Sequence, residues 1–175
     1  LVLYGFVVVH LLGNLKVYQG REKFNHYAEW LRTMGEPFFG REQLLWILRI
    51  ILLIALFVHI AAVVQLYMQS RRARRHNYKK YEGLEFSYAS RTMLWGGIII
   101  LAYVIYHLLH FTFGTLHPDF VPGDVYNNFV VGFQQWPASL AYILAMVPLG
   151  LHMYHGFWSM LQTLGANNPK YNKVR

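Results

Sequence analysis

The 175-residue chain contains no cysteine, and this absence removes two kinds of redox centre from consideration. Without thiolates the chain cannot hold a thiolate-ligated iron–sulfur cluster, and it cannot attach a c-type haem covalently. Charged residues are also scarce, at 14% of the chain against about 25% in an average soluble protein. Hydrophobic residues make up 55% of the chain. A soluble domain of this size does not need so much apolar surface.

The apolar residues are gathered into long blocks. Residues 44–67, 93–113 and 138–161 each reach the roughly 20 residues that cross a bilayer as a helix. A shorter block, 1–17, has no basic region before it, so we interpret it as the remainder of a clipped span and not as a signal peptide. The pattern predicts an all-α transmembrane helix bundle in one membrane-embedded domain, 1–175, with spans at about 1–17, 42–69, 89–113 and 138–163.

The positive charge is unevenly distributed between the loops. Arg71–Lys80 holds six Lys or Arg residues directly after the second predicted span, whereas 114–137 contains Asp119 and Asp124 and no Lys or Arg. The positive-inside rule therefore predicts that 71–91 faces the cytoplasm and that 114–137 faces outward. This distribution argues against a nucleic-acid partner, although the basic run could also meet anionic lipid or an acidic partner protein.

The segments between the predicted spans carry two weaker signals. Lys23–Met34 alternates polar and apolar residues as a short amphipathic helix does, and Gly35 and Pro37 would end it. The outer segment contains Trp136 and other aromatic residues that are typical of the bilayer interface.

Histidine occurs at membrane depth in every predicted span. Ionisable groups inside spans are rare and usually functional. For any single histidine, a neutral imidazole that is hydrogen-bonded across helices is an equally good explanation. Recurrence in all four spans favours a shared function. The residues are His10 in the first span, His59 in the second, His107 and His110 in the third, and His152 and His155 in the fourth.

Depth groups four of these histidines into two pairs. With a rise of about 1.5 Å per residue, His10 and His107 lie at similar distances from the outer ends of their spans. His59 and His152 lie about ten and about twelve residues from the inner ends of theirs. Two opposed pairs at two depths are what two stacked bis-histidine haems require. A zinc site would need three or four ligands at one depth, usually with a carboxylate or a thiolate, and the spans contain no acidic residue beyond Glu42 at the very start of the second.

Polar residues near the histidines could hold haem propionates. Arg49 and Arg91 are favoured because their charge complements a carboxylate, although either could instead be a snorkelling or topology-setting arginine. Small residues near the histidines would let a flat ring approach a helix, or would serve ordinary helix packing. The further propionate candidates are Asn14, Ser90, Ser159, His110 and His155, and the small residues are Gly13, Gly150 and Gly156.

Four segments of the chain resemble a known family. They are "VVVHLLGNL", "LFVHIAAVVQLY", "YASRTMLWGGIIILAYVIYHLLHFTFG" and "LGLHMYHGFWSMLQTLGANNPKYN". Together they resemble the cytochrome b558 subunit of succinate dehydrogenase and fumarate reductase, in particular its single-subunit, two-haem membrane anchor. The resemblance covers nearly the whole chain. Family members have five spans, so it implies a fifth span beyond Arg175.

The resemblance implies specific ligands and partners. The axial pairs would be His10 with His107 in the outer haem and His59 with His152 in the inner haem. A flavoprotein with covalent FAD and an iron–sulfur subunit would dock on the cytoplasmic face of a bacterial inner membrane. Electrons would pass between them and a membrane quinone, commonly menaquinone, through two b haems. The complex of this chain with the two soluble subunits would be a succinate:quinone oxidoreductase or a fumarate reductase. Such complexes can assemble into a higher oligomer.

The resemblance leaves several questions open. Weak candidates for a menaquinone site near the outer haem are His110, Glu29 and Glu36. One alternative is the haem b subunit of a hydrogenase or a formate dehydrogenase, which co-purifying covalent flavin would distinguish. Others are a haem-free transporter with a histidine-lined path and a passive anchor, both of which predict a colourless protein.

Overall fold

The computed structural model describes residues 1–73 and 88–165, with side chains from residue 92 onward in the second range. The described residues form helices and turns without any strand, which confirms the predicted all-α fold class. The chain divides into two compact units, Leu1–Leu84 and Glu85–Arg175, and each is described by itself below. The single domain over the whole chain stays a prediction.

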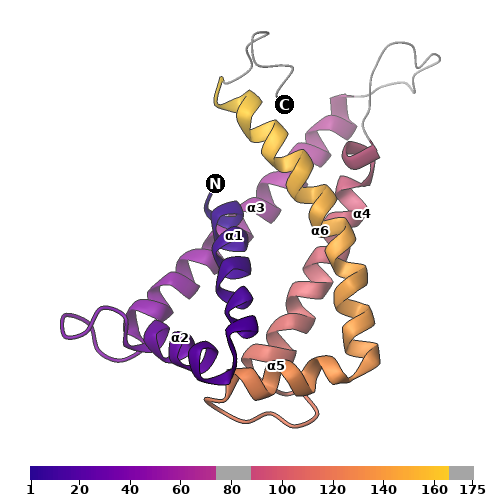
Figure 1. Ribbon diagram of the computed structural model, residues 1–175. Helices are drawn as coiled ribbons and strands as arrows, with labels where there is room; N and C mark the ends of the chain where they lie inside the picture. Colours follow the sequence, from indigo (N-terminus) through magenta and orange to yellow (C-terminus); the bar gives the residue numbers. More distant parts are fainter. Residues whose placement is uncertain (74–87, 166–175) are drawn as a thin grey trace. The chain divides into compact units, whose positions relative to one another are not determined.

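The first unit contains a short apolar helix, an amphipathic helix and one long apolar helix. Its elements are α1 (Val2–Asn14), the 3₁₀ helix η1 (Leu15–Gln19), α2 (Arg21–Thr33) and α3 (Gln43–Ala73) (Figure 1). The predicted amphipathic helix at Lys23–Met34 is confirmed as α2, which buries Phe24. A Cβ atom at Gly13 would lie 2.9 Å from the hydroxyl of Tyr27, so this glycine lets α2 pack against the end of α1.

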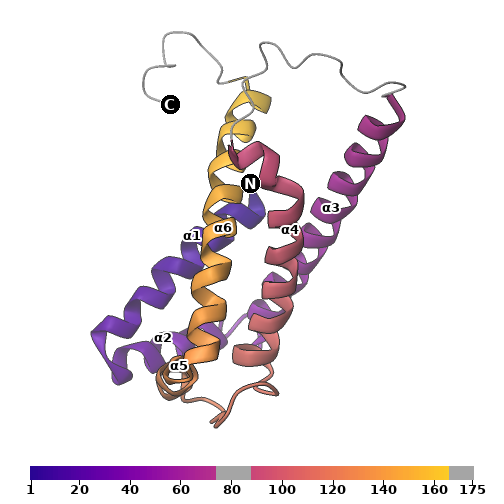
Figure 2. The same cartoon turned by 90° about the vertical axis from the view of Figure 1, so that its right-hand side faces the viewer.

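The second unit is a hairpin of two long helices with a short helix across one end. Its elements are α4 (Tyr88–His107), the π-helix η2 (Leu108–Thr112), α5 (Val125–Gln134) and α6 (Trp136–Thr163). Helix α4 packs along α6, and α5 lies at the foot of both (Figures 1 and 2). A Cβ atom at Gly96 would lie 3.6 Å from the Cβ of Pro148, which shows how closely the two helices approach.

Three helical segments are long and apolar enough to cross a membrane: Gln43–Ala73, Thr92–Thr112 and Trp136–Thr163. The most apolar stretch of α3 has none of its residues buried. So much exposed apolar surface is untenable in water and ordinary in lipid. These segments match three of the four predicted spans. Helix α1 is apolar but has only 13 residues, so the fourth span stays a prediction.

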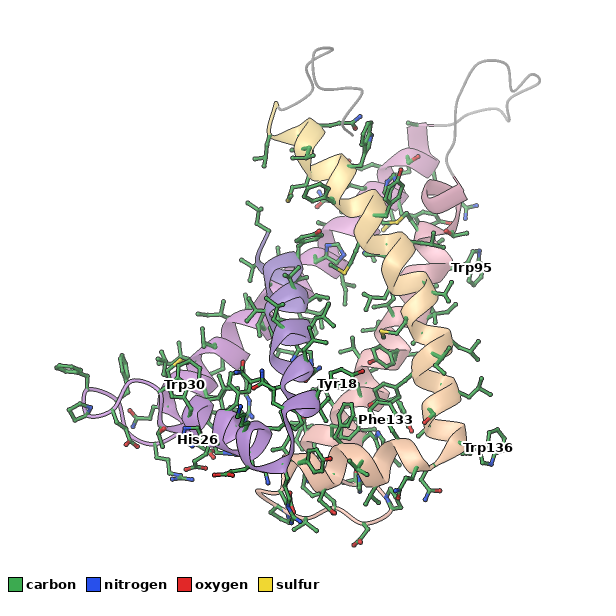
Figure 3. The ribbon with its side chains drawn as sticks, viewed as in Figure 1. Tyr18, His26, Trp30, Trp95, Phe133 and Trp136 are labelled. Carbon is green, nitrogen blue, oxygen red and sulfur yellow. The ribbon has the colours of Figure 1, made fainter. Side chains whose placement is uncertain are left out.

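The segment 114–137, predicted to face outward, is more ordered than the sequence led us to expect, because it contains α5. The side chain of Asp124 accepts a hydrogen bond from the backbone N–H of Asn127 at 3.2 Å and so caps this helix. Phe133 of α5 packs toward η2 and α6, whereas Trp136 points away from the unit and is 74% exposed (Figure 3). The exposure of Trp136 suits the predicted interface position.

Candidate functional site: a buried histidine–tyrosine cluster

Two of the predicted histidines meet at a single tyrosine in the second unit. His107 is the last residue of α4, and His110 lies one turn later in η2. The Nδ1 atoms of His107 and His110 lie 3.1 Å and 3.2 Å from the hydroxyl oxygen of Tyr142 on α6. The two histidines therefore share one helical face, as their spacing predicts. Tyr142 is itself buried.

The site lies where the α-helix changes to a π-helix. In η2 the backbone N–H of Phe113 donates to the carbonyl oxygen of Leu108 at 2.8 Å, which is the i to i+5 spacing of a π turn. Single π turns of this kind are frequent at functional sites. The change of pitch places Phe111 against His110, with the ring centres 4.3 Å apart.

His110 is enclosed by side chains and backbone of its own unit. Only 1% of its surface is exposed, and its ring stacks against those of Tyr106 and His117. A Cβ atom at Gly132 of α5 would lie 3.1 Å from Cε1 of His110. The His110 ring therefore has no room beside it for a ligand as large as a haem or a quinone. Its predicted roles at a propionate and in a menaquinone site stay predictions.

A third histidine, His117, belongs to the cluster and was not predicted. Its Nδ1 accepts a hydrogen bond from the backbone N–H of Asp119 at 3.1 Å, and its Nε2 lies 2.8 Å from the carbonyl oxygen of Asn128. Since a carbonyl can only accept, Nε2 carries the proton and His117 is a neutral Nε2–H tautomer. Its position in a loop next to Pro118 gave no helical spacing to identify it from sequence.

Asn128 fastens the loop before α5 to the helix. Its side-chain amide accepts from the N–H of Val121 and donates to the carbonyl of the same residue, both at 2.8 Å. Asn128 is 4% exposed. The amide therefore takes the place of a backbone partner for both peptide groups of Val121, which fixes the loop that carries His117.

The other predicted ligands lie on three separate helices. His10 on α1 is exposed and stacks on Phe6 with ring centres 5.2 Å apart. His59 on α3 is exposed, and His152 on α6 is half-buried, with its Nδ1 atom buried. His155, one turn beyond His152, is also half-buried. Each predicted pair joins a histidine of one unit to a histidine of the other, and the pairing stays a prediction.

The residues predicted to hold haem propionates lie at scattered positions on their helices. The guanidinium of Arg49 lies over the ring of Trp46, with its central carbon 4.9 Å from the ring centre. Asn14 ends α1, and Ser159 lies exposed on α6. Residues Ser90 and Arg91 belong to α4, but their side chains lie outside the described part of the structure, as do residues 74–80 of the predicted basic run.

The glycines near the histidines do not share one role. The face of Gly13 is filled by Tyr27, which favours ordinary packing there. A Cβ atom at Gly150 or Gly156, on either side of His152, would meet no described atom within 4 Å. The two predicted acidic candidates for quinone also differ in setting: Glu29 forms ion pairs with Arg41 at 2.7 Å and with Arg32 at 3.9 Å, whereas Glu36 precedes Pro37 in the α2–α3 loop.

Comparison of the chain with protein-family models, with curated proteins and with solved structures finds no match. Among residues 1–73 and 88–165, no group of three or more His, Cys, Asp or Glu side chains is arranged to hold a metal ion. A six-coordinate haem iron takes only two protein ligands, so this finding bears on zinc-type sites and not on haem.

Proposed function

We propose that this protein is the membrane-anchor cytochrome b subunit of a succinate:quinone oxidoreductase. In this proposal it holds two b haems, each between two histidines, and passes electrons between an iron–sulfur subunit and a membrane quinone. A bis-histidine haem supplies reversible one-electron transfer at an iron with both axial positions filled. The chain itself would bind, space and insulate the haems and would not oxidise succinate.

The observation that carries the proposal is the register of the histidines within their helices. His59 is sixteen residues after Gln43, the first residue of α3, and His152 is sixteen residues after Trp136, the first residue of α6. At about 1.5 Å per residue, both lie about 24 Å along their helices. In the predicted topology both helices begin at the outer face, and the two histidines would then lie at one depth.

His10 and His107, the predicted outer pair, also lie at similar distances from the ends of their helices. His10 is four residues before the end of α1 at Asn14, and His107 is five residues before the end of η2 at Thr112. Both lie about 6–8 Å from the predicted outer ends of their helices. In the predicted topology the two pairs would differ in depth by about 17 Å, a separation that suits two stacked haems.

The donor chemistry also fits haem. Imidazole nitrogen is an ordinary axial ligand of b haems, and it needs a hydrogen-bond partner at its other nitrogen to set its orientation. Tyr142 provides that partner for His107. The open faces of Gly150 and Gly156 beside His152 leave space for a flat ring. The exposed apolar surface of α3, which carries His59, supports a lipid environment for the proposed pair of His59 and His152.

Pairing is tested by combining histidine substitutions and counting haem by pyridine haemochrome. We expect His10→Ala and His107→Ala to remove the same haem, so their double variant keeps as much haem as either single variant. We expect His10→Ala combined with His59→Ala to remove both haems. His26→Ala, which changes an exposed histidine on α2, serves as the matched control and keeps both. Unchanged haem content in all four single variants, at His10, His59, His107 and His152, would refute the proposal.

A further inference from the structure

We infer that Tyr142 is a positioning residue that fixes the tautomer of His107, so that Nε2 of His107 binds the iron of the outer haem while His110 serves only as the second hydrogen-bond partner of the tyrosine. The inference rests on the proposed function and goes beyond it. It concerns what fixes the tautomer and orientation of one axial histidine, and it assigns a role to Tyr142, which is not itself a ligand.

Hydrogen-bond counting gives the first step. The Tyr142 hydroxyl has one proton, and it lies within hydrogen-bond distance of Nδ1 of both His107 and His110. It can therefore donate to only one of these nitrogens. The other Nδ1 must carry a proton of its own and donate to the tyrosine oxygen. At least one of the two imidazoles thus carries a proton on Nδ1, and in its neutral form its Nε2 lone pair is directed away from Tyr142 and can bind a metal.

Packing decides which histidine takes that tautomer. The ring of His110 is 1% exposed, and the close approach of Gly132 leaves no space beside its Cε1 atom. The ring of His107 is half-buried, and three aromatic rings of the second unit lie 5.8–6.0 Å from it between ring centres. Only His107 can therefore reach a haem without repacking the cluster. It donates from Nδ1 to Tyr142, and Tyr142 donates to His110.

The side chain of Tyr142 is fixed by packing, so it can determine which histidine carries its proton on Nδ1. Its ring packs edge-on against those of Phe133, Tyr103 and Phe111, with ring centres 4.8, 5.2 and 5.7 Å apart. The residue is 8% exposed and lies on a continuous stretch of α6. A side chain locked by packing on a rigid helix is what keeps a metal ligand in its binding geometry.

The hydrogen bond also has an electronic consequence. An imidazole that donates from Nδ1 to an oxygen is a more basic ligand at Nε2, and a more basic ligand favours ferric over ferrous iron. Without the tyrosine hydroxyl, the outer haem becomes easier to reduce. The inner haem, whose proposed ligands are His59 and His152, is unaffected.

The test is a redox titration of the purified full-length chain with its haems, comparing Tyr142→Phe with the unaltered protein. We expect two haems per chain in both. At a fixed potential, the ratio of reduced to oxidised outer haem rises about tenfold in the variant, equivalent to about 59 mV for a one-electron couple. The low-spin ferric signal of that haem also shifts in electron paramagnetic resonance. Tyr103→Phe removes a hydroxyl from a ring beside the same histidine and serves as the matched control, with neither readout changed.

Two haems in Tyr142→Phe with both potentials and both resonance signals unchanged would overturn the inference while leaving the proposed function intact. An unaltered protein without haem would overturn the proposed function and the inference together. Should Tyr142→Phe not fold, His110→Leu provides the second test. It removes the partner that accepts the tyrosine proton, so the hydroxyl oxygen becomes a weaker acceptor for Nδ1–H of His107 and the outer haem becomes easier to reduce, as in Tyr142→Phe. Two haems with unchanged potentials in His110→Leu would overturn the inference.

Discussion

Replacing His107 with alanine is expected to lower the haem content of the purified protein from two per chain to one, whereas His110→Asn keeps both. The two histidines are three residues apart and touch the same tyrosine, but His107 is half-buried whereas His110 is buried. Loss of an axial imidazole leaves the iron with a single protein ligand. Asparagine at 110 still offers a short polar group to the hydroxyl of Tyr142. Haem is counted by pyridine haemochrome, and the remaining component is followed in the reduced-minus-oxidised spectrum.

Comparing His107→Ala with His110→Asn also tests whether His107, and not His110, is the haem ligand. Retention of both haems in His107→Ala together with loss of one in His110→Asn would show that the ligand is His110. In that case the tight packing of His110 against Gly132 would have to open in the haem-bound protein. Circular dichroism of each variant confirms that the helices are retained before haem is compared.

Alanine at Gly114 is expected to destabilise the protein by about 3 kcal/mol or more, through backbone strain combined with a steric clash. Gly114 follows η2 with φ at +73°, a conformation that side chains other than glycine rarely adopt. A Cβ atom there would collide with the ring of Phe120, which packs edge-on against His117. The substitution therefore disturbs both the turn and the histidine cluster. Thermal unfolding in detergent, followed by circular dichroism, measures the effect.

Gly123→Ala is the matched control in the same loop. Gly123 also has a positive φ, at +88°, but a Cβ atom there would meet no described atom within 4 Å. Its substitution isolates the backbone strain and is expected to cost about 1 kcal/mol. Equal destabilisation by the two substitutions would contradict the account, because it would mean that Phe120 moves aside and that the loop does not hold the cluster rigidly.

The long apolar elements could be predicted from sequence because their signal is strong and local. Predicted spans at 42–69, 89–113 and 138–163 correspond to α3, to α4 with η2, and to α6. A run of more than 20 apolar residues has few alternatives to a membrane helix. The shared face of His107 and His110 was predictable for the same reason, since it follows from helical spacing alone.

What the sequence did not reveal depends on contacts between elements. Nothing local shows that α4 ends in a π turn, or that Gly132 and Tyr142 close over His110. The cap of α5 at Asp124 was a readable signal, because an aspartate before a run of apolar and amide residues often begins a helix. The interpretation of 114–137 as a connecting segment with interfacial aromatic residues left this helix out.

The central claim is that this chain holds two b haems. The most direct test is the reduced-minus-oxidised visible spectrum of the purified, unmodified protein from a haem-replete host, with a pyridine haemochrome count per chain. The account predicts a b-type spectrum and two haems per chain. A colourless preparation with its helices intact would contradict it. The histidines would then be explained by hydrogen bonds between packed helices or by a transport path.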